Sequence, residues 1–276
     1  MRDIWEEQLQ WLGSGEPFVL ARVIRTWRSA PRKTGAGMLI GKGMRVAGSV
    51  SGGCIEGAVI EEALEVLESG ESRQLSYGVE DDLALSVGLS CGGEVSVLAE
   101  KHWAFSADPQ TKEVWNALQN SIRNNCPAIL ISPLPSAGAS SRGNQSELLV
   151  LPGGENMGGF QENREEAVAL AEEAYNGREN RIVEIAGKEV FIQVFPRRDQ
   201  LLIIGAGHIS IPLVRFAKEL DFLTIVIDPR GVFANPERFS VPPDQLISKW
   251  PDDVLPGFPI NEDTYAILLT HDPKID

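Results

Sequence analysis

The sequence predicts an α/β protein with two domains, a mixed α/β domain over residues 1–196 and a smaller parallel-sheet domain over residues 197–276. In the first part, segments with helical periodicity are interspersed with β-branched, strand-like runs. In the second, buried-type strands alternate with a helix, which favours a parallel sheet. Between them, "PRRDQ" at residues 196–200 places charge and proline between two apolar runs, as domain linkers do.

The N-terminal domain should begin with an amphipathic helix at residues 4–12 and a strand at residues 18–27. The basic loop, "RSAPRKTGAG" at residues 28–37, then leads into a hairpin-like strand pair. A helix with apolar residues at helical spacing starts at Ile55 and should end at Gly70. Further on we expect strands at residues 73–78, 93–100, 127–135 and 147–152, helices at 109–124 and 163–179, and a hairpin over 181–195.

The C-terminal domain opens with "LLIIGAGHIS", which reads as a buried strand, a glycine turn and a helix start. Two more buried strands follow, in "LTIVIDPR" and "TYAILLTHD". This is a Rossmann-like order, but only 76 residues lie beyond residue 200, which is short for a full doubly wound sheet. We therefore expect this domain to be truncated and the natural protein to be longer.

Charge and composition exclude several classes of partner. The formal net charge is −14, whereas nucleic acids and anionic membranes select basic surfaces. No apolar run reaches the roughly 20 residues of a membrane span, and acidic residues occupy the place of a signal-peptide core. The three cysteines lack CxxC spacing, so they predict free thiols in a reducing compartment. We expect a cytoplasmic protein with no nucleic-acid or membrane partner.

Gly205 and Gly207 begin a dinucleotide-binding pattern whose third glycine is replaced by Ser210. Glycines at such a turn let the backbone approach a pyrophosphate at a helix N-terminus. Asp228 follows 23 residues after Gly205, near the offset at which an acid meets a ribose hydroxyl. His208 lies in the turn, either facing a ligand or, as we favour, capping the helix. Whether this turn binds NAD(P) is left open by the sequence, because the fold does not dictate the ligand.

"GSVSGGCIEG", residues 48–57, is a strand-to-helix turn that contains a cysteine. Its simplest interpretation is that Gly52 and Gly53 supply positive φ angles, Ser51 caps the next helix, and Cys54 is a small buried apolar residue. The functional interpretation is that the amides of this turn form an anion nest, which would also favour the thiolate of Cys54.

"LSCGGEVSV", residues 89–97, adds weight to the functional interpretation. Cys91 precedes Gly92 and Gly93 at the entry of a strand, where backbone can approach a ligand closely. The basic loop carries Arg32 among other cations, which could serve a phosphate-bearing ligand if the loop folds over the glycine turns. On the simpler interpretation it is a solvated loop.

The chain resembles the xanthine dehydrogenase accessory factor (XdhC) family of molybdenum-hydroxylase maturation proteins in four segments. In chain order they are "SVSGGCIEGAV", "LSCGGEVSVLAE", "LLIIGAGHIS" with "IVIDPR", and "LLTHDPKID". The resemblance implies a factor that binds the molybdenum cofactor, molybdopterin, protects it during sulfuration and delivers it to a molybdenum hydroxylase apoenzyme. It implies a cysteine desulfurase as a second partner, and we expect a homo-oligomer. Such a protein is a chaperone for a cofactor rather than an enzyme.

By resemblance, Cys91 is the first candidate for contacting molybdenum and Cys54 the second, while the glycine-turn amides would hold the pterin phosphate. A rival interpretation is an NAD(P)-dependent oxidoreductase built on the Gly205 turn, with His208 or His271 as acid or base. A third is an assembly scaffold that binds no cofactor.

Overall fold

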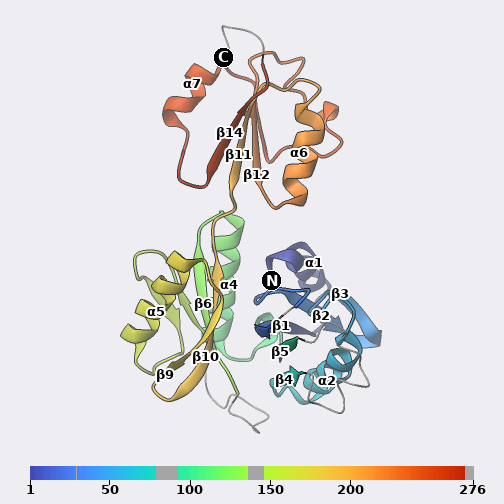
Figure 1. The fold of residues 1–276 in the computed structure, drawn as a ribbon, viewed down its shortest axis with the longest axis vertical. Helices are drawn as coiled ribbons and strands as arrows, with labels where there is room; N and C mark the ends of the chain where they lie inside the picture. The colour runs from blue at the N-terminus through green and yellow to red at the C-terminus, as the bar shows by residue number, and fades with distance from the viewer. Residues whose placement is uncertain (29, 79–92, 136–145, 271–276) are drawn as a thin grey trace. The chain divides into compact units, whose positions relative to one another are not determined.

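A computed structural model describes residues 1–28, 30–78, 93–135 and 146–270. The chain divides into two compact units, Met1–Pro196 and Arg197–Asp276. The predicted fold class is confirmed, because the first unit combines helices with antiparallel sheets and the second contains a parallel sheet (Figure 1).

The first sheet of unit 1 has five antiparallel strands in the order β3-β2-β1-β5-β4. Helix α2 (Glu56–Ser69) packs on it through Val59, Ala63 and Val66, which recur at the spacing of one helix face. The helix ends at Gly70, whose φ of 76° is the left-handed C-cap that its sequence predicts. The strands are β1 (Phe18–Trp27), β2 (Gly37–Gly41), β3 (Arg45–Gly48), β4 (Arg73–Tyr77) and β5 (Glu94–Lys101).

The second sheet of unit 1, also antiparallel, has the order β8-β7-β6-β10-β9. Its two faces bury alternate residues against α4 (Pro109–Arg123) and α5 (Arg164–Gly177). The predicted hairpin turns at Ala186 and Gly187, both with positive φ. The strands are β6 (Ala128–Pro133), β7 (Leu148–Val150), β8 (Asn156–Gly158), β9 (Arg181–Ile185) and β10 (Lys188–Phe195).

An aromatic core and a buried arginine are among the interactions that join the sheets of unit 1. Helix α1 (Trp5–Ser14), preceded by the short turn η1 (Arg2–Ile4), contributes to an aromatic core with residues from both sheets. Arg22 of β1 is fully buried and donates to Glu100 Oε1 at 2.6 Å in its own sheet. It also donates to Ser132 Oγ at 3.0 Å and Gln193 Oε1 at 3.1 Å in the other sheet. The buried guanidinium therefore links the two sheets.

Unit 2 is a four-stranded parallel sheet in the order β13-β12-β11-β14. Helix α6 (Ser210–Glu219) packs on one face and α7 (Pro251–Val254) with its following turn packs on the other, as Figure 1 shows. The parallel pairing predicted for the three buried strands is confirmed. The strands are β11 (Gln200–Ile204), β12 (Leu223–Ile227), β13 (Gln245–Ile247) and β14 (Thr264–Leu268).

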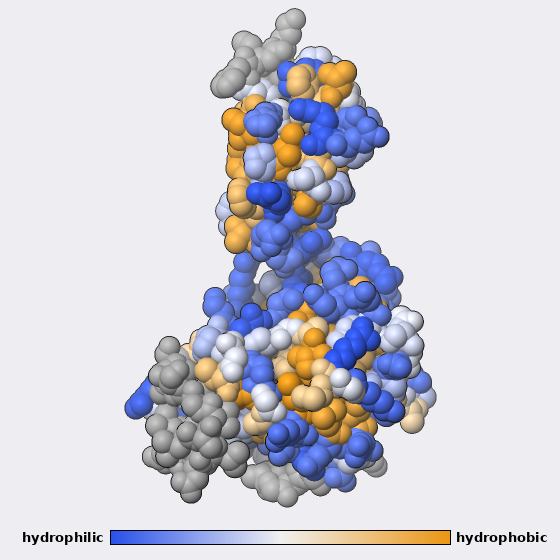
Figure 2. All heavy atoms as spheres, turned by 90° about the vertical axis from the view of Figure 1, so that its right-hand side faces the viewer, coloured by the Kyte–Doolittle hydropathy of each residue, from blue (hydrophilic) through white to orange (hydrophobic). Residues whose placement is uncertain are grey.

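The surface of unit 2 carries exposed apolar side chains. Figure 2 looks onto the side that bears α6 and shows hydrophobic surface there. Among the described helices, none is both long and apolar enough to cross a bilayer. The exposed apolar side chains of this unit include Ile209, Phe216, Leu220, Val232, Trp250, Ile260, Tyr265 and Leu268.

Candidate functional site

The turn between β3 and α2, residues 49–55, is called the SGG turn here. Gly52 and Gly53 have φ angles of 80° and 116°, so the predicted need for glycine at these positions is confirmed. Ser51 is fully buried, and its hydroxyl accepts hydrogen bonds from the N–H groups of Cys54 and Ile55, each at 3.0 Å. Ser51 thus binds amides of the turn, whereas α2 begins after Ile55 without a side-chain cap, so the expectation that Ser51 caps this helix is wrong.

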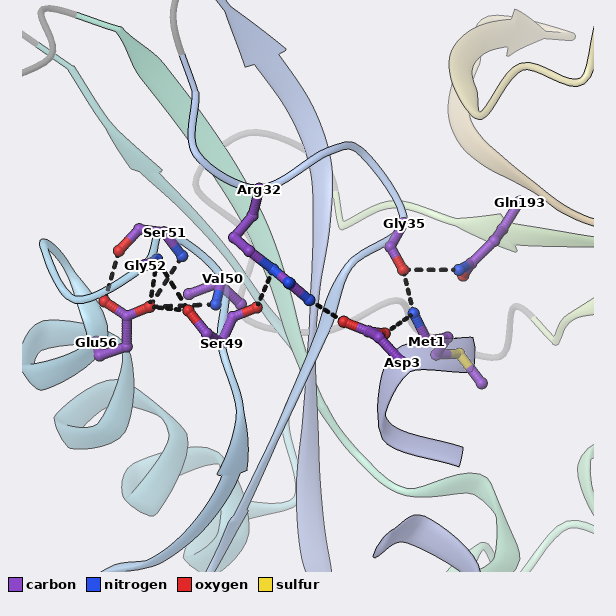
Figure 3. Close-up of polar contacts among 10 residues, drawn as sticks. All are labelled: Met1, Asp3, Arg32, Gly35, Ser49, Val50, Ser51, Gly52, Glu56 and Gln193. Carbon is purple, nitrogen blue, oxygen red and sulfur yellow. Dashed lines mark hydrogen bonds and ion pairs between the residues drawn. The ribbon is translucent and has the colours of Figure 1, made fainter. Parts of the chain in front are cut away.

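The carboxylate of Glu56 lies at the centre of the SGG turn, where it accepts six hydrogen bonds. Figure 3 shows those from Ser49, Val50, Ser51 and Gly52. On the functional interpretation of the sequence the amides of this turn form an anion nest, and the chain's own carboxylate binds these amides. The donors are the N–H groups of Val50 (3.2 Å), Ser51 (2.9 Å), Gly52 (3.1 Å) and Gly53 (2.9 Å), and the hydroxyls of Ser49 (2.6 Å) and Ser51.

The ionisation of Glu56 follows from these contacts. Burial raises the pKa of its carboxyl group, but the hydrogen bonds from Ser49 and Ser51 outweigh burial and lower the pKa to about 2. The helix N-terminus also favours negative charge at this position. Glu56 is therefore an anion at neutral pH, and a ligand phosphate could reach these amides only by displacing it.

The basic loop folds over the SGG turn. Arg32 donates from Nε to the Ser49 carbonyl oxygen at 3.2 Å, and its Nη2 forms an ion pair with Asp3 (Figure 3). A Cβ atom at Gly52 would lie 3.2 Å from the Cβ of Pro31, so the two segments are in contact. A role for Arg32 in ligand binding requires that the basic loop lie over the glycine turn, and the structure has this arrangement.

A cavity of about 430 Å³ lies beside the basic loop, lined by residues 1–3, residues 31–36, Asn180 and residues 193–195. Three of its lining side chains are cations, namely Arg2, Arg32 and Lys33, and one is the anion Asp3. Segments from both ends of unit 1 therefore build this cavity against the loop. Its size is within the range of small-ligand pockets.

Hydrogen bonds hold the polar wall of the cavity in place. The Gly35 carbonyl oxygen accepts from Gln193 Nε2 at 3.1 Å and from the amino group of Met1. Asn180 donates to the Thr34 carbonyl oxygen at 2.8 Å and accepts from the Val194 N–H at 2.7 Å. The wall is tied to the second sheet at both points, so its shape does not depend on the loop alone.

The structure describes one of the two candidate thiols, Cys54, and not the other. Cys54 is a partly buried free cysteine packed against the apolar cluster beneath α2, in keeping with its simpler interpretation. Cys91 and Gly92 lie outside the described residues, and Gly93 is buried directly before β5. In the described part of the chain, no three His, Cys, Asp or Glu side chains are grouped so as to hold a metal ion. The assignment of Cys91 as a metal contact stays a prediction.

The glycine turn of unit 2 has the tight geometry that its sequence predicts. Gly205 has a φ of 105°, and a Cβ there would lie 2.7 Å from Thr270 Cγ2. The following amide, of Ala206, donates to Asp228 Oδ2 at 2.8 Å. The Gly207 carbonyl oxygen accepts from the Ser210 hydroxyl at 2.6 Å, so the residue that replaces the third glycine stabilises the turn.

Asp228 is fully buried, and its carboxylate accepts four hydrogen bonds inside unit 2. Besides the Ala206 amide, its donors are the N–H, Nε and Nη2 of Arg230, at 2.9, 2.9 and 2.8 Å. Burial raises the pKa of Asp228, but the hydrogen bonds from Arg230 and Ala206 outweigh it and leave the pKa lowered. A carboxylate has about four lone-pair sites, so contact with a ribose hydroxyl would require Arg230 or Ala206 to be released.

The two described histidines differ in environment. His208 is exposed, and the N-terminus of α6 has no side-chain cap, so the expectation that His208 caps this helix is wrong. The Ser210 hydroxyl donates to the Gly207 carbonyl oxygen, so it stabilises the turn without capping the amides of the helix. His102 is fully buried against Phe18 and Trp115, and burial together with the Arg22 charge lowers its pKa to about 3.

Glu56, Asp3, Asn180 and Gln193 were not among the residues predicted from the sequence. An acidic residue in the first turn of a helix was a local signal for Glu56, because such residues satisfy free amides at a helix start. The other three have no local signal. They reach the cavity through the folding of segments that are far apart in sequence.

The fold and the two turns define the class of this protein. It is a two-part α/β protein whose second unit is a short Rossmann-like sheet with a glycine turn. Residues 11–78 match the XdhC and CoxI family, and residues 201–276 match the XdhC Rossmann domain. The chain belongs to the XdhC and CoxI family, as the resemblance of its motifs predicts.

Relatives extend the similarity along the chain. A protein of Bacillus subtilis (strain 168) described as a probable xanthine dehydrogenase component is 26% identical over 263 residues, which are 93% of this chain and 72% of that protein. The molybdenum cofactor insertion chaperone PaoD of Escherichia coli (strain K12) is 36% identical over 100 residues, 36% of this chain and 31% of that protein. A crystal structure of a xanthine dehydrogenase from Bacillus halodurans superposes with a TM-score of 0.76 at 25% identity, covering 97% of this chain and 74% of that one.

Proposed function

We propose that this protein is a maturation factor that binds the molybdenum cofactor, protects it during sulfuration and delivers it to a molybdenum hydroxylase. The observation that carries the proposal is the cation-lined cavity beside the SGG turn. In a chain with a net charge of −14, three cations around one cavity are a selective place for an anionic cargo. Membership of the XdhC and CoxI family and the similarity to a molybdenum cofactor insertion chaperone support it.

In this proposal the cofactor is cargo. Arg32 and Lys33 hold its anionic end, and the polar wall that includes Gln193 receives its hydrogen-bonding ring. Cys91 contacts the molybdenum, and Cys54 is second in line for that role. The partners are the hydroxylase apoenzyme and a cysteine desulfurase, the protein is a homo-oligomer, and we place it in the cytoplasm. It acts as a chaperone without turnover of its own.

The test is molybdopterin binding by the purified protein, measured by equilibrium dialysis under reducing conditions. Replacing Cys91 with alanine should weaken binding, and Cys54→Ala should weaken it less. Cys126→Ala is the matched control, because Cys126 is an exposed free cysteine whose thiol bonds only the nearby Asn124 carbonyl. Wild-type protein that binds no molybdopterin would refute the function. Binding unaltered in Cys91→Ala would refute the role of that thiol.

The rival interpretation, an NAD(P)-dependent oxidoreductase, depends on the Gly205 turn. Asp228, which it requires for the ribose, is bonded to Arg230 and Ala206 instead. Titration with NAD(H) and NADP(H) separates the two interpretations. Tight binding followed by hydride transfer would favour the oxidoreductase, whereas binding without turnover would leave the chaperone proposal intact.

A further inference from the structure

Two carboxylates of this chain bind the basic and amide donors around the cavity and the SGG turn. Glu56 occupies the amide nest with six hydrogen bonds, and Asp3 forms an ion pair with Arg32. Each lies where an external anion would otherwise bind. If a ligand replaces Glu56, its phosphate binds the SGG amides. If it replaces Asp3, its phosphate binds Arg32 at the cavity wall.

Glu56 is the harder of the two to displace. Its carboxylate holds the turn itself, so releasing it would leave the N–H groups of Val50, Ser51 and Gly53 without their acceptor, while that of Gly52 would keep only Ser49 Oγ. Asp3 is bound less extensively. Its side chain is one-third exposed, and it contacts Arg32 and the Met1 amino group, which lies 2.8 Å from its Oδ1. Losing the contact to Arg32 alone leaves Asp3 solvated and still paired.

Arg32 is arranged so that it can exchange one anion for another. Its Nε is anchored on the Ser49 carbonyl oxygen at 3.2 Å, which fixes the guanidinium at the cavity wall while Nη2 meets the anion. Lys33 follows it on the same wall, is exposed, and has no ion pair with any described residue. A phosphate monoester carries more charge than a carboxylate and has three acceptor oxygens, so it can engage both cations at once.

We propose that the cavity binds the phosphate group of a phosphomonoester ligand on Arg32 and Lys33, and that this phosphate displaces Asp3 from Arg32. The proposal rests on the proposed function, in which Arg32 and Lys33 hold the anionic end of the cargo, and it adds that this end is a phosphate and that Asp3 is the group it displaces. No bond is made or broken, because one anion replaces another.

The test uses inorganic phosphate as the probe, titrated into the full chain by isothermal calorimetry at low ionic strength. Asp3→Asn removes the internal competitor and should tighten phosphate binding by about threefold, the size expected for a partly exposed ion pair. Arg32→Ala should weaken binding by about tenfold, because it removes a charge-assisted donor. Arg32→Lys, which keeps the charge but loses the anchored fork, should bind phosphate with an affinity between those of Arg32→Ala and the wild type.

The controls come from a second ion pair in the same unit. Arg25 and Glu189 form an exposed pair at 3.1 Å outside the cavity lining, so Arg25→Ala and Glu189→Gln should bind phosphate like the wild type. Lys33→Ala removes the second cation of the cavity wall and should also weaken phosphate binding. Lys112→Ala, on the exposed face of α4, is its matched control and should bind phosphate like the wild type. Circular dichroism of each variant establishes that it is folded before binding is measured.

Three results would overturn the proposal. They are no phosphate binding by the wild type, no tightening in Asp3→Asn, and tightening in Glu56→Gln instead, which would return the phosphate to the amide nest. The outcome is separable from that of the proposed function. If the protein binds phosphate as proposed but does not bind molybdopterin, the proposed function is refuted and the anion site is supported. If it binds molybdopterin but does not bind phosphate as proposed, only the anion site is refuted.

Discussion

Ser51 and Glu56 are hydrogen-bonded twice, since the backbone N–H of Ser51 donates to Oε1 at 2.9 Å and its hydroxyl donates to Oε2. The same hydroxyl accepts from the amides of Cys54 and Ile55. One serine thus connects the carboxylate in the nest with the amides at the helix start. The SGG turn is therefore stabilised by hydrogen bonds within the chain, and its conformation does not require a ligand.

Replacing Glu56 with glutamine should destabilise unit 1. The amide offers one acceptor and two donors, so several backbone N–H groups lose their partner, at a cost of about 2 kcal/mol. Urea unfolding measures the free energy of unfolding. Glu68→Gln, on the exposed part of α2, is the control and should behave like the wild type. Equal stability of the two variants would contradict the role of Glu56.

Acid should weaken the SGG turn through the same carboxylate. The pKa of Glu56 falls from its usual 4.5 to about 2 in the folded protein. Because the folded pKa is the lower one, its contribution to stability is fully present above pH 4.5 and is lost as the pH falls toward 2. The free energy of unfolding of Glu56→Gln should therefore fall less steeply than that of the wild type across this window, and parallel curves would refute the assignment.

His102 should make stability depend on pH in a higher window. Burial lowers its pKa from 6.5 to about 3, so below pH 6.5 the unfolded chain takes up a proton that the folded chain does not. Stability falls as the pH drops, by at most about 1.4 kcal/mol per pH unit. Between pH 6.5 and 5, His102→Phe should flatten this slope. A slope of wild-type size in His102→Phe would exclude this origin.

Asp228 should act as a structural clamp in unit 2. Asp228→Asn loses the two-point contact with the Arg230 side chain and disturbs the acceptor for Ala206, which should cost about 2 kcal/mol. Hydrogen exchange of a peptide covering residues 201–210 reports on the turn and should accelerate. Asp252→Asn, at an exposed position of α7, is the control. Unchanged exchange in Asp228→Asn would show that the carboxylate is dispensable for the turn.

Arg22 should be the most sensitive link between the two sheets of unit 1. Arg22→Met leaves the buried carboxylate of Glu100 without its guanidinium, and breaking a buried pair in this way costs about 3–5 kcal/mol. Adding Glu100→Gln should recover part of the loss, because it removes the charge. Arg25→Met breaks an exposed pair and should cost less than about 1 kcal/mol. Equal losses from Arg22→Met and Arg25→Met would contradict the argument.

Local patterns were enough to predict most elements of this fold. Apolar residues at helical spacing identified α2, and the glycine after it marked the helix end, because only glycine adopts the left-handed C-cap without strain. The order of strands in the two antiparallel sheets was not predictable in the same way. Strand pairing depends on contacts between segments distant in sequence, for which a single sequence carries no direct signal.

In the candidate site, too, local features were predictable from the sequence and contacts between distant segments were not. The sequence by itself determined the SGG turn, with its two glycines, and the glycine turn of unit 2, because these depend on backbone conformation within a few residues. The tertiary structure decided which groups those turns bind. Glu56 fills one nest, Arg230 binds Asp228, and the cavity forms where the basic loop meets Asn180 and Gln193. A donor bonds the acceptor nearest to it in space, and only the folded chain sets those distances.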